Sequence, residues 1–483
     1  MNLERILYCR GYCFLDSSIS FEFPTYFNKY RLDENYSFYS DDSNQISVMH
    51  INNDWIVLCG LIIDTYDSSL DINSIANNIY QYLSISENYF LEYLDSLSGR
   101  FILAYKYNNK CYFYNDACGM KSAYYFLKNK KIISSHQNLV KNISGITELS
   151  FVTQVPKEEK IPFSYGYPGR TTTIKDIYQL TPNTRINLNN SSIERFFPRE
   201  DLEKTNCFSS VEMFVKRNFQ NQISYLKRTK LKPVISLTAG YDSRFTLASL
   251  KEELKNFIFF TYKSHEAHNI DLLMGKDISE RLELCHRILL IKDEDKNDKL
   301  FSQFCNIMAK NSFYVHNYIV AYKYLLSFLG LSSFQSQFIH IRSNLAEIGR
   351  LFYGLHSREE IFTSVDMIKL WKRYKSDTNN IEEIKYAFDD FYITTNFGHL
   401  YNYNPNDIFY WEHRMGTWLS QVLVESDPAF DTLILFNNRK VLKALLSVPT
   451  EARKNNTIFY NIINNFLPEL KDYPINPNSW PLP

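Results

Sequence analysis

The sequence predicts an α+β half followed by an α/β half, and three observations favour this fold class. Two short apolar runs flank an Asn-Asn turn within 99–114, which is typical of an antiparallel hairpin. An apolar run, a small-residue loop and an amphipathic segment follow one another over 233–250. Beyond that point, apolar runs alternate with helical patterns, which indicates a parallel, doubly wound sheet.

Residues 1 to about 195 read as strands with two helices, and the join to the second half is expected near 182–198. The predicted domains are therefore 1–195 and 196–483. The elements predicted in the first are a strand at Trp55–Ile63 and helices at Ile72–Leu83 and Tyr89–Leu97, with Asp71 and Ser86 as helix caps.

The second half begins with a predicted helix at 208–227 and ends in a largely helical third. Between them, the predicted strands are 234–237, 257–262, 288–291 and 338–341, with a helix at 270–284. Because ligands of such folds bind outside the carboxyl ends of the strands, the loops that follow these strands are the candidate site.

The composition limits which classes of binding partner we expect. The 483 residues carry 53 basic and 53 acidic side chains, so we expect neither a nucleic acid nor a membrane as partner. The eight cysteines are scattered without a CxxC pair, which indicates a reduced, cytoplasmic protein. No signal peptide is recognised at the N-terminus, and no apolar run reaches the roughly 18 residues of a membrane span.

The loop Thr238–Ser243 has the chemistry of an anion site. Its N–H groups and the start of the following helix favour a phosphate, and Gly240 allows a close backbone approach. Thr238 and Ser243 add hydroxyl donors, and Asp242 with Ser243 is expected to cap the helix. Since Asp242 would repel phosphate, its expected role is that of a ligand for Mg²⁺ that bridges to the phosphates.

This loop resembles the Ser-Gly-Gly-x-Asp-Ser pyrophosphate loop of the asparagine synthetase superfamily, with Thr238 and Ala239 as departures. The run 97–126 resembles the second half of the glutamine amidotransferase domain that precedes the synthetase domain in that family. The resemblance implies an αββα sandwich of the N-terminal-nucleophile type over 1–195. It implies a pyrophosphate-loop synthetase domain, similar to adenine nucleotide alpha hydrolases, with a helical C-terminal part over 196–483.

The resemblance also implies ATP and Mg²⁺ as cofactors. The residues expected to bind ATP are Ser236, Leu237, Thr238, Gly240, Asp242, Ser243, Arg244, Thr261 and Arg342, and Asp242 is the expected metal ligand. In the family, a second loop closes on pyrophosphate, and residues 340–350 occupy the corresponding position in this chain. Only Glu347 keeps an acidic position there, while Arg342 and Arg350 supply guanidinium forks that suit phosphate. The alternative is a helix start in which Glu347 and Arg350 form a surface pair.

Three residues are predicted to be catalytic: Glu347, Glu412 and Lys454. Glu412 could take a proton from an attacking amine, or lie on a solvated face. Lys454 resembles the family lysine that holds pyrophosphate, although its spacing departs from the family pattern and an exposed lysine is the alternative.

One departure from the family pattern excludes one of the activities that the resemblance would otherwise imply. The active amidotransferase has a cysteine after the initiator methionine, whose thiolate attacks glutamine and whose free amine acts as base. This chain has Asn2 there, and Cys9 and Cys13 lie within a strand-like stretch. The first domain is therefore expected to lack glutaminase activity.

The expected function is an AMP-forming carbon–nitrogen ligase or cyclase that adenylates a small-molecule or peptide carboxylate and joins it to an amine. Lactam or macrolactam formation, with partner biosynthetic proteins, resembles the layout of β-lactam synthetases and lasso-peptide cyclases. The alternatives are a non-catalytic nucleotide-binding relic, a synthetase that uses free ammonia, and a tRNA-modifying adenylyltransferase. The last would favour a basic surface or a CxxC, which the sequence lacks.

Overall fold

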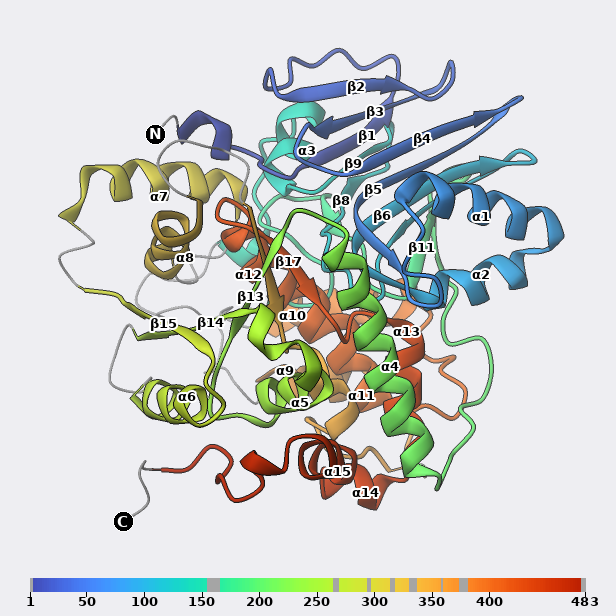
Figure 1. The fold of residues 1–483 in the computed structure, drawn as a ribbon. Helices are drawn as coiled ribbons and strands as arrows, with labels where there is room; N and C mark the ends of the chain where they lie inside the picture. Colours follow the sequence, from blue (N-terminus) through green and yellow to red (C-terminus); the bar gives the residue numbers. More distant parts are fainter. Residues whose placement is uncertain are drawn as a thin grey trace.

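A computed structural model describes residues 3–153, 166–263, 269–292, 297–312, 318–329, 337–357, 359–372 and 381–478. Three sheets organise these residues (Figure 1). Two of them are antiparallel and come from the first 195 residues, and the third is parallel and comes from 232–434. The predicted succession of an antiparallel part and a parallel part is confirmed.

The two antiparallel sheets have six strands each. The first has the order β10-β8-β9-β1-β3-β2: β1 Tyr12–Asp16, β2 Phe27–Arg31, β3 Tyr36–Asp41, β8 Tyr124–Phe126, β9 Ile132–Ser134 and β10 Tyr178–Gln179. The second has the order β12-β11-β7-β6-β5-β4: β4 Ile46–Ile51, β5 Asp54–Asp64, β6 Leu97–Tyr107, β7 Lys110–Asn115, β11 Thr184–Asn187 and β12 Ser192–Arg195. The predicted hairpin is the β6–β7 pair.

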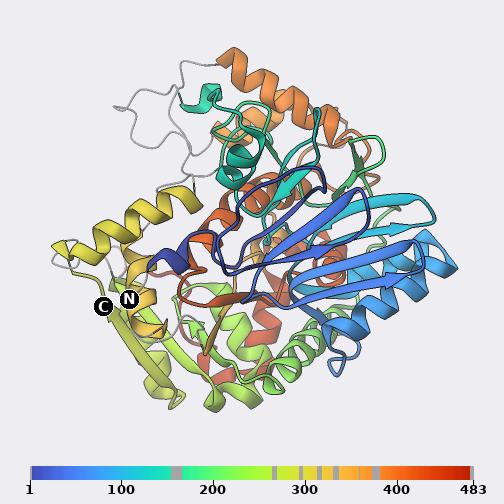
Figure 2. The same ribbon diagram turned by 90° about the horizontal axis from the view of Figure 1, so that it is seen from above.

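Alternation along the strands divides the core into layers. On β5, Val57 and Cys59 join a cluster with Phe14 and Phe38 of the other sheet, so the two sheets pack face to face. The intervening Leu58 faces helices α1 (Ile72–Ile85) and α2 (Glu87–Ser96). Helix α3 (Gln137–Ser144) packs on the outer face of the first sheet. Figure 2 shows α1 and α2 along one side of the strands.

Both predicted caps of these helices are confirmed. The Asp71 carboxylate accepts a hydrogen bond from the Ser74 N–H at the start of α1. The Ser86 hydroxyl accepts one from the Tyr89 N–H at the start of α2. Each bond satisfies an N–H that has no partner within its helix.

The parallel sheet has the order β15-β14-β13-β16-β17. Its strands are β13 Lys232–Ser236, β14 Ile258–Lys263, β15 Cys285–Leu290, β16 Phe338–Arg342 and β17 Asp431–Ile434, and every pair is parallel. Four of them were predicted, whereas β17 was not recognised as a strand. Because chain order reverses between β13 and β16, the carboxyl ends of these two strands form the topological switch point.

Helices cover both faces of this sheet. The helices of the second half are α4 Phe208–Lys227, α5 Tyr241–Ser249, α6 Asn269–Arg281, α7 Lys299–Asn311, α8 Tyr318–Tyr324, α9 Ser364–Lys372, α10 Ile381–Thr394, α11 Pro405–Phe409, α12 Ser420–Ser426, α13 Arg439–Ser447, α14 Thr450–Lys454 and α15 Thr457–Phe466, with a π-helical segment at Tyr410–Leu419. Helices α4, α5, α6, α13 and α15 share a core with Ile235 of β13. Helix α8 packs on the opposite face through Val320 and Tyr324, against Val234. Among the described residues, none of these helices is long and apolar enough to cross a bilayer.

A buried polar seam joins the second antiparallel sheet to the parallel sheet. Arg100 of β6 forms a bidentate ion pair with Asp427, at 2.7 and 3.1 Å, and reaches Asp431 at 3.3 Å. Beyond β17, the Asn437 amide donates to the Gly99 carbonyl at 2.6 Å, and its oxygen accepts from the Cys118 N–H at 2.9 Å. The two halves are thus fixed in register by charged and hydrogen-bonding groups that are removed from water.

We predict that Arg100→Met lowers the free energy of unfolding by about 3–5 kcal/mol, because it leaves the buried Asp427 carboxylate without its cation. The measurement is urea denaturation at neutral pH. Lys255→Met is the matched control, since the Lys255–Glu283 pair is exposed and should contribute about 1 kcal/mol or less. An equal loss in both variants would contradict the structural role of the seam.

Candidate functional site

The loop between β13 and α5 lies at the switch point and is held by its own hydroxyl groups. The Ser243 hydroxyl donates to the Thr238 carbonyl at 3.0 Å and lies 3.0 Å from the Thr238 hydroxyl. Gly240, rather than Asp242 or Ser243, occupies the N-cap position, without a side-chain cap. The expectation of a side-chain N-cap is therefore wrong, because Asp242 and Ser243 already lie in the first helical turn.

Gly240 leaves space beside the loop. Its φ of −82° is open to any residue. A Cβ added there would meet the Asn476 side chain at 3.5 Å and the Thr238 hydroxyl at 3.7 Å, which are ordinary contacts. The glycine is thus not required by the backbone in this structure, and its missing side chain leaves open the approach to the start of α5.

One loop amide already has an anionic partner. The Ala239 N–H donates to the Asp271 carboxylate of α6 at 2.8 Å. Helix α6 itself approaches closely, because a Cβ on Gly275 would stand 2.6 Å from the Thr261 hydroxyl. The Asp271 carboxylate thus fixes the loop from the side of β14.

Two carboxylates and one arginine meet at the start of α5. Asp242 forms an ion pair with Arg350 at 2.6 Å. Burial raises the pKa of Asp242, while the Arg350 guanidinium opposes that rise. Burial, with the nearby Asp242 charge, raises the pKa of Glu347 to about 8. The Glu347 Oε2 atom is buried and has no hydrogen-bond partner among the described residues. Arg350 thus pairs with Asp242, which corrects the alternative of a surface pair between Glu347 and Arg350.

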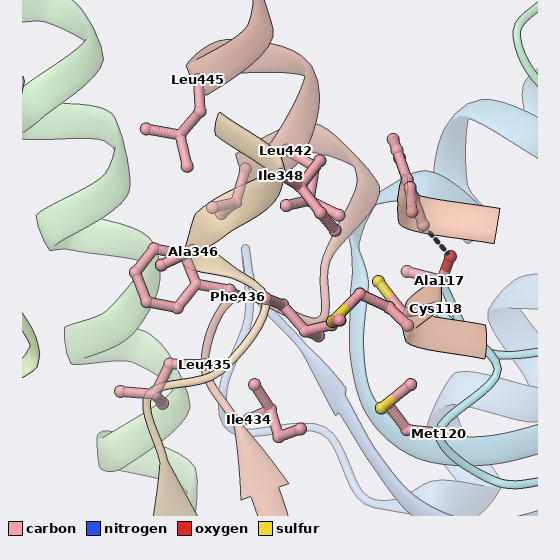
Figure 3. Packing of buried hydrophobic residues seen from close by; sticks show 14 of the residues in the cluster. Ala117, Cys118, Met120, Ala346, Ile348, Ile434, Leu435, Phe436, Leu442 and Leu445 are labelled. Atoms are coloured by element: carbon pink, nitrogen blue, oxygen red, sulfur yellow. Dashed lines mark hydrogen bonds between the residues drawn. The ribbon is translucent and has the colours of Figure 1, made fainter. Parts of the chain in front are cut away.

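The 3-10 turn Ala346–Arg350, which carries Glu347 and Arg350, is anchored from behind. Arg453 donates to the Gly349 carbonyl at 2.9 Å and to the Ile348 carbonyl at 3.2 Å, and its charge is balanced by Asp407 at 2.8 Å. Figure 3 shows Ala346 and Ile348 beside Leu442 and Leu445 of α13. A Cβ on Gly349 would stand only 2.9 Å from the Leu445 Cβ, so this turn rests directly on α13.

Arg342 ends β16 next to the end of β13, because Ile341 is in register with Ile235. Its Nε donates to the Asn344 side chain at 3.0 Å. Within the described part of the chain, its two Nη groups form no hydrogen bond. The adjacent Ser343 hydroxyl is also buried without a partner. These groups place unused donors at the switch point, as a phosphate site requires.

Arg244 does not face the loop's open side. It is fully buried, and it donates to the Tyr473 carbonyl at 2.8 Å, the Pro474 carbonyl at 2.7 Å and the Ala239 carbonyl at 3.0 Å. Burial lowers its pKa to about 10. The prediction that Arg244 binds the nucleotide is therefore corrected: its guanidinium ties the loop to residues 473–474.

Three further residues of the expected nucleotide set lie in or beside the core. Leu237 is buried and its N–H donates to the Phe260 carbonyl at 2.9 Å. The Thr261 hydroxyl donates to the Leu237 carbonyl at 2.8 Å, so this side chain ties β14 to β13 instead of facing a ligand. Ser236 is half-buried at the end of β13, beside Arg342.

The structure corrects Glu412. It is fully buried, and Arg195 holds both of its carboxylate oxygens at 2.6 and 2.8 Å, while Asn183 adds a bond at 3.1 Å. Burial raises the pKa of Glu412, and Arg195 opposes that rise. A carboxylate occupied in this way cannot serve as a base for an amine, and its role is to join the two halves of the chain.

Lys454 is exposed at the end of α14, whereas the buried neighbour Arg453 supports the turn at 346–350. Arg453, one residue from the predicted Lys454, was not predicted from the sequence. Nor was Asn456, whose side chain accepts a hydrogen bond from Arg350 Nε at 2.9 Å. Asn456 has a φ of 54°, in the left-handed region that asparagine tolerates better than most residues. An asparagine between two helical patterns is thus the one feature of the sequence that could have indicated this position.

The carboxylates at this site supply only part of the ligand set that Mg²⁺ needs. In the part of the chain that the structure describes, no three His, Cys, Asp or Glu side chains gather to hold a metal ion. Asp242 and Glu347 lie near enough for the Asp242 charge to raise the pKa of Glu347, and Glu347 Oε2 lacks a hydrogen-bond partner among the described residues. Mg²⁺ binds in proteins through one or two carboxylates together with water and substrate phosphates, so this pair fits a cation that arrives with a triphosphate.

The two cysteines near the first strand are not suited to attack. Cys13 of β1 is fully buried and Cys9 is nearly so. Burial raises the pKa of both thiols, so they stay protonated at neutral pH.

Comparison with known proteins leaves the family open. No family model matches the chain, and no curated protein matches it. Among solved structures, glutamine phosphoribosylpyrophosphate amidotransferase from B. subtilis, complexed with ADP and GMP, aligns over 76% of this chain and 74% of its own. The identity is 7% and the TM-score 0.24. A structure described as the allosteric regulatory enzyme of purine biosynthesis aligns over 76% and 73%, with 8% identity and a TM-score of 0.24. Overlaps this slight do not identify the fold.

We predict a pH-dependent stability that comes from Glu347. Its pKa is raised from 4.5 to about 8, so between these values the folded state holds a proton that the unfolded state has lost. The free energy of unfolding should therefore fall as pH rises through this window in the native protein, and fall less in Glu347→Gln. Urea denaturation across the window measures the difference, and parallel curves for the two proteins would contradict the buried carboxylic acid.

We also predict that the protein does not hydrolyse glutamine. The purified protein is incubated with glutamine, ATP and Mg²⁺, and glutamate is measured against a boiled control. Glutamate that disappears in Cys9→Ala or Cys13→Ala would reveal a thiol nucleophile. Glutamate that survives both changes would show a nucleophile of another kind.

Proposed function

We propose that this protein is an ATP-dependent ligase that activates a substrate carboxylate as its adenylate and joins it to an amine. In this proposal, the antiparallel half is a degenerate glutamine amidotransferase of the N-terminal-nucleophile type, and the parallel half is a synthetase of the asparagine synthetase kind. The observation that carries it is the loop Thr238–Ser243 at the switch point, where Asp242 faces Glu347 and Arg350.

Four features support a nucleotide at this place. The start of α5 presents its first N–H groups beside Gly240, which suits a phosphate. One strand away, the Nη groups of Arg342 have no partner in the described part of the chain. Asp242 and Glu347 would hold Mg²⁺, which, when bound, supplies positive charge against the phosphates. The Arg350 guanidinium already neutralises Asp242 and adds a second fork on the same side.

The reaction would run in two steps. The substrate carboxylate attacks the α-phosphorus of ATP, which forms an acyl-adenylate and releases pyrophosphate. An amine then attacks the acyl carbon, which forms the amide and releases AMP, while the amine loses a proton to the solvent. Arg342 and the α5 N-terminus would stabilise the negative charge on the departing pyrophosphate, so the work of this chain is positioning and charge stabilisation.

The nitrogen should come from outside the antiparallel half, since its buried thiols are protonated. The amine is therefore free ammonia, a second substrate, or an amine of the activated molecule itself. The last choice would give a lactam or macrolactam, as in peptide or natural-product biosynthesis.

A second candidate has its own supporting observation. The Asp271 carboxylate accepts from the Ala239 N–H, and Arg350 pairs with Asp242, so two polar groups of the loop already have partners without a ligand. This favours a nucleotide-binding relic that binds weakly and does not turn over.

The test measures ATP affinity by calorimetry and exchange of labelled pyrophosphate into ATP in the presence of mixed carboxylic acids. We expect the native protein to bind MgATP, and Asp242→Asn to lose about tenfold or more in affinity and all exchange, because the amide keeps the shape but not the charge. Asp54→Asn is the control, since Asp54 lies in β5 and its Oδ1 accepts from the Asn108 N–H, a bond that an asparagine oxygen can keep.

Each result separates the candidates. MgATP binding with no exchange for any acid tested would favour the relic. Binding or exchange that survives Asp242→Asn would move the site away from this loop, and no MgATP binding by the native protein would overturn both candidates.

A further inference from the structure

A cavity of about 410 Å³ lies between α2, α4 and α13, away from the Thr238–Ser243 loop. Three acidic and three basic side chains line it: Glu92, Asp95, Glu203, Arg439, Lys440 and Lys443. Its apolar lining includes Phe197, Leu202, Phe214 and Ala444. The lining charges of opposite sign balance, so an ion of either sign alone would gain little net attraction, whereas a ligand that carries both charges would be matched.

The acidic wall holds an oxygen without a partner. Asp95 is 5% exposed, and its Oδ2 accepts from Arg199 at 2.6 Å. Its Oδ1 is buried and forms no hydrogen bond with any residue that the structure describes. The nearest cation, Arg439, stands 3.9 Å from that oxygen and donates instead to the Asn183 side chain at 2.9 Å. A buried carboxylate oxygen left in this way costs stability, and burial raises the pKa of Asp95.

Helix α13 contributes replaceable cations to the cavity. Lys440 lies 3.9 Å from Glu92, and Lys443 pairs with Glu200, whose side chain is 62% exposed. Exposed pairs of this kind contribute little to stability, so either ammonium group can exchange its partner for a ligand carboxylate at small cost.

We propose that this cavity binds a free amino acid with an apolar side chain. The ligand ammonium donates to Asp95 Oδ1, its carboxylate is held by Lys440 and Lys443, and its side chain packs against Leu202 and Phe214. The site is separate from the proposed nucleotide site, and it does not depend on the proposed function.

Helix α13 gives this site a direct structural link to the turn at 346–350. Ala444 and Lys443 face the cavity, whereas Leu445 packs against Gly349 on the other side of the helix. Helix α13 therefore contacts both a ligand in the cavity and the turn that carries Glu347 and Arg350.

The experiment uses the full chain and L-leucine as the probe, with calorimetry and thermal denaturation as readouts. Its two analogues each lack one charge: 3-methylbutylamine has no carboxylate, and 4-methylpentanoate has no ammonium. We expect leucine to bind and to raise the melting temperature, and each analogue to bind about tenfold or more weakly, because one charged contact is missing.

Two variants locate the site. Asp95→Asn keeps an oxygen for Arg199 but removes the charge, and Ala444→Phe fills the cavity while every charged residue stays. Both should lose about tenfold or more in leucine affinity, whereas the control Asp54→Asn should not. If Asp95→Asn does not fold, Ala444→Phe decides alone. Absence of leucine binding by the native protein, equal binding of either analogue, or leucine binding unchanged in Ala444→Phe would each overturn the proposal.

Discussion

The arrangement of this protein depends on the buried polar seam around β17. Asn437 is fully buried, and its side chain bonds to the Gly99 carbonyl, the Asp116 carboxylate and the Cys118 N–H. Arg100 adds its ion pairs to Asp427 and Asp431. Polar groups in a dry interface are stable only when all their partners are in place, so this seam permits one docking geometry. A purely apolar seam would tolerate sliding, whereas these directional bonds do not.

The seam also sets the position of the candidate site. The chain passes from β17 through Asn437 directly into α13, and α13 supports the turn that carries Glu347. On the other side of this segment, Trp411 donates to the Ala117 carbonyl at 2.8 Å, the bond drawn as a dashed line in Figure 3. The antiparallel half therefore supports the candidate site through packing.

At the site, charge is balanced closely but incompletely. Arg350 forms an ion pair with Asp242, and the Asp271 carboxylate accepts a hydrogen bond from the Ala239 N–H. In contrast, Glu347 Oε2 and the Nη groups of Arg342 have no partners among the described residues. The remaining carboxylate oxygen suits a cation, and the remaining guanidinium donors suit an anion. A metal–triphosphate complex brings both charges together, and this is the physical basis of the proposed function.

The sequence by itself determined the elements whose signals are local. Alternation and apolar runs located β13, β14, β15 and β16, and the caps Asp71 and Ser86 were read correctly, because periodicity and capping act over a few residues. The short strand β17 was missed, since its four residues pair only with β16, far away in the chain. Only the tertiary structure decided the partners of the charged residues. Glu412 meets Arg195 and Asp242 meets Arg350 across 217 and 108 residues. Charge pairing at such separations leaves no pattern in one sequence, because it is set by how the sheets dock.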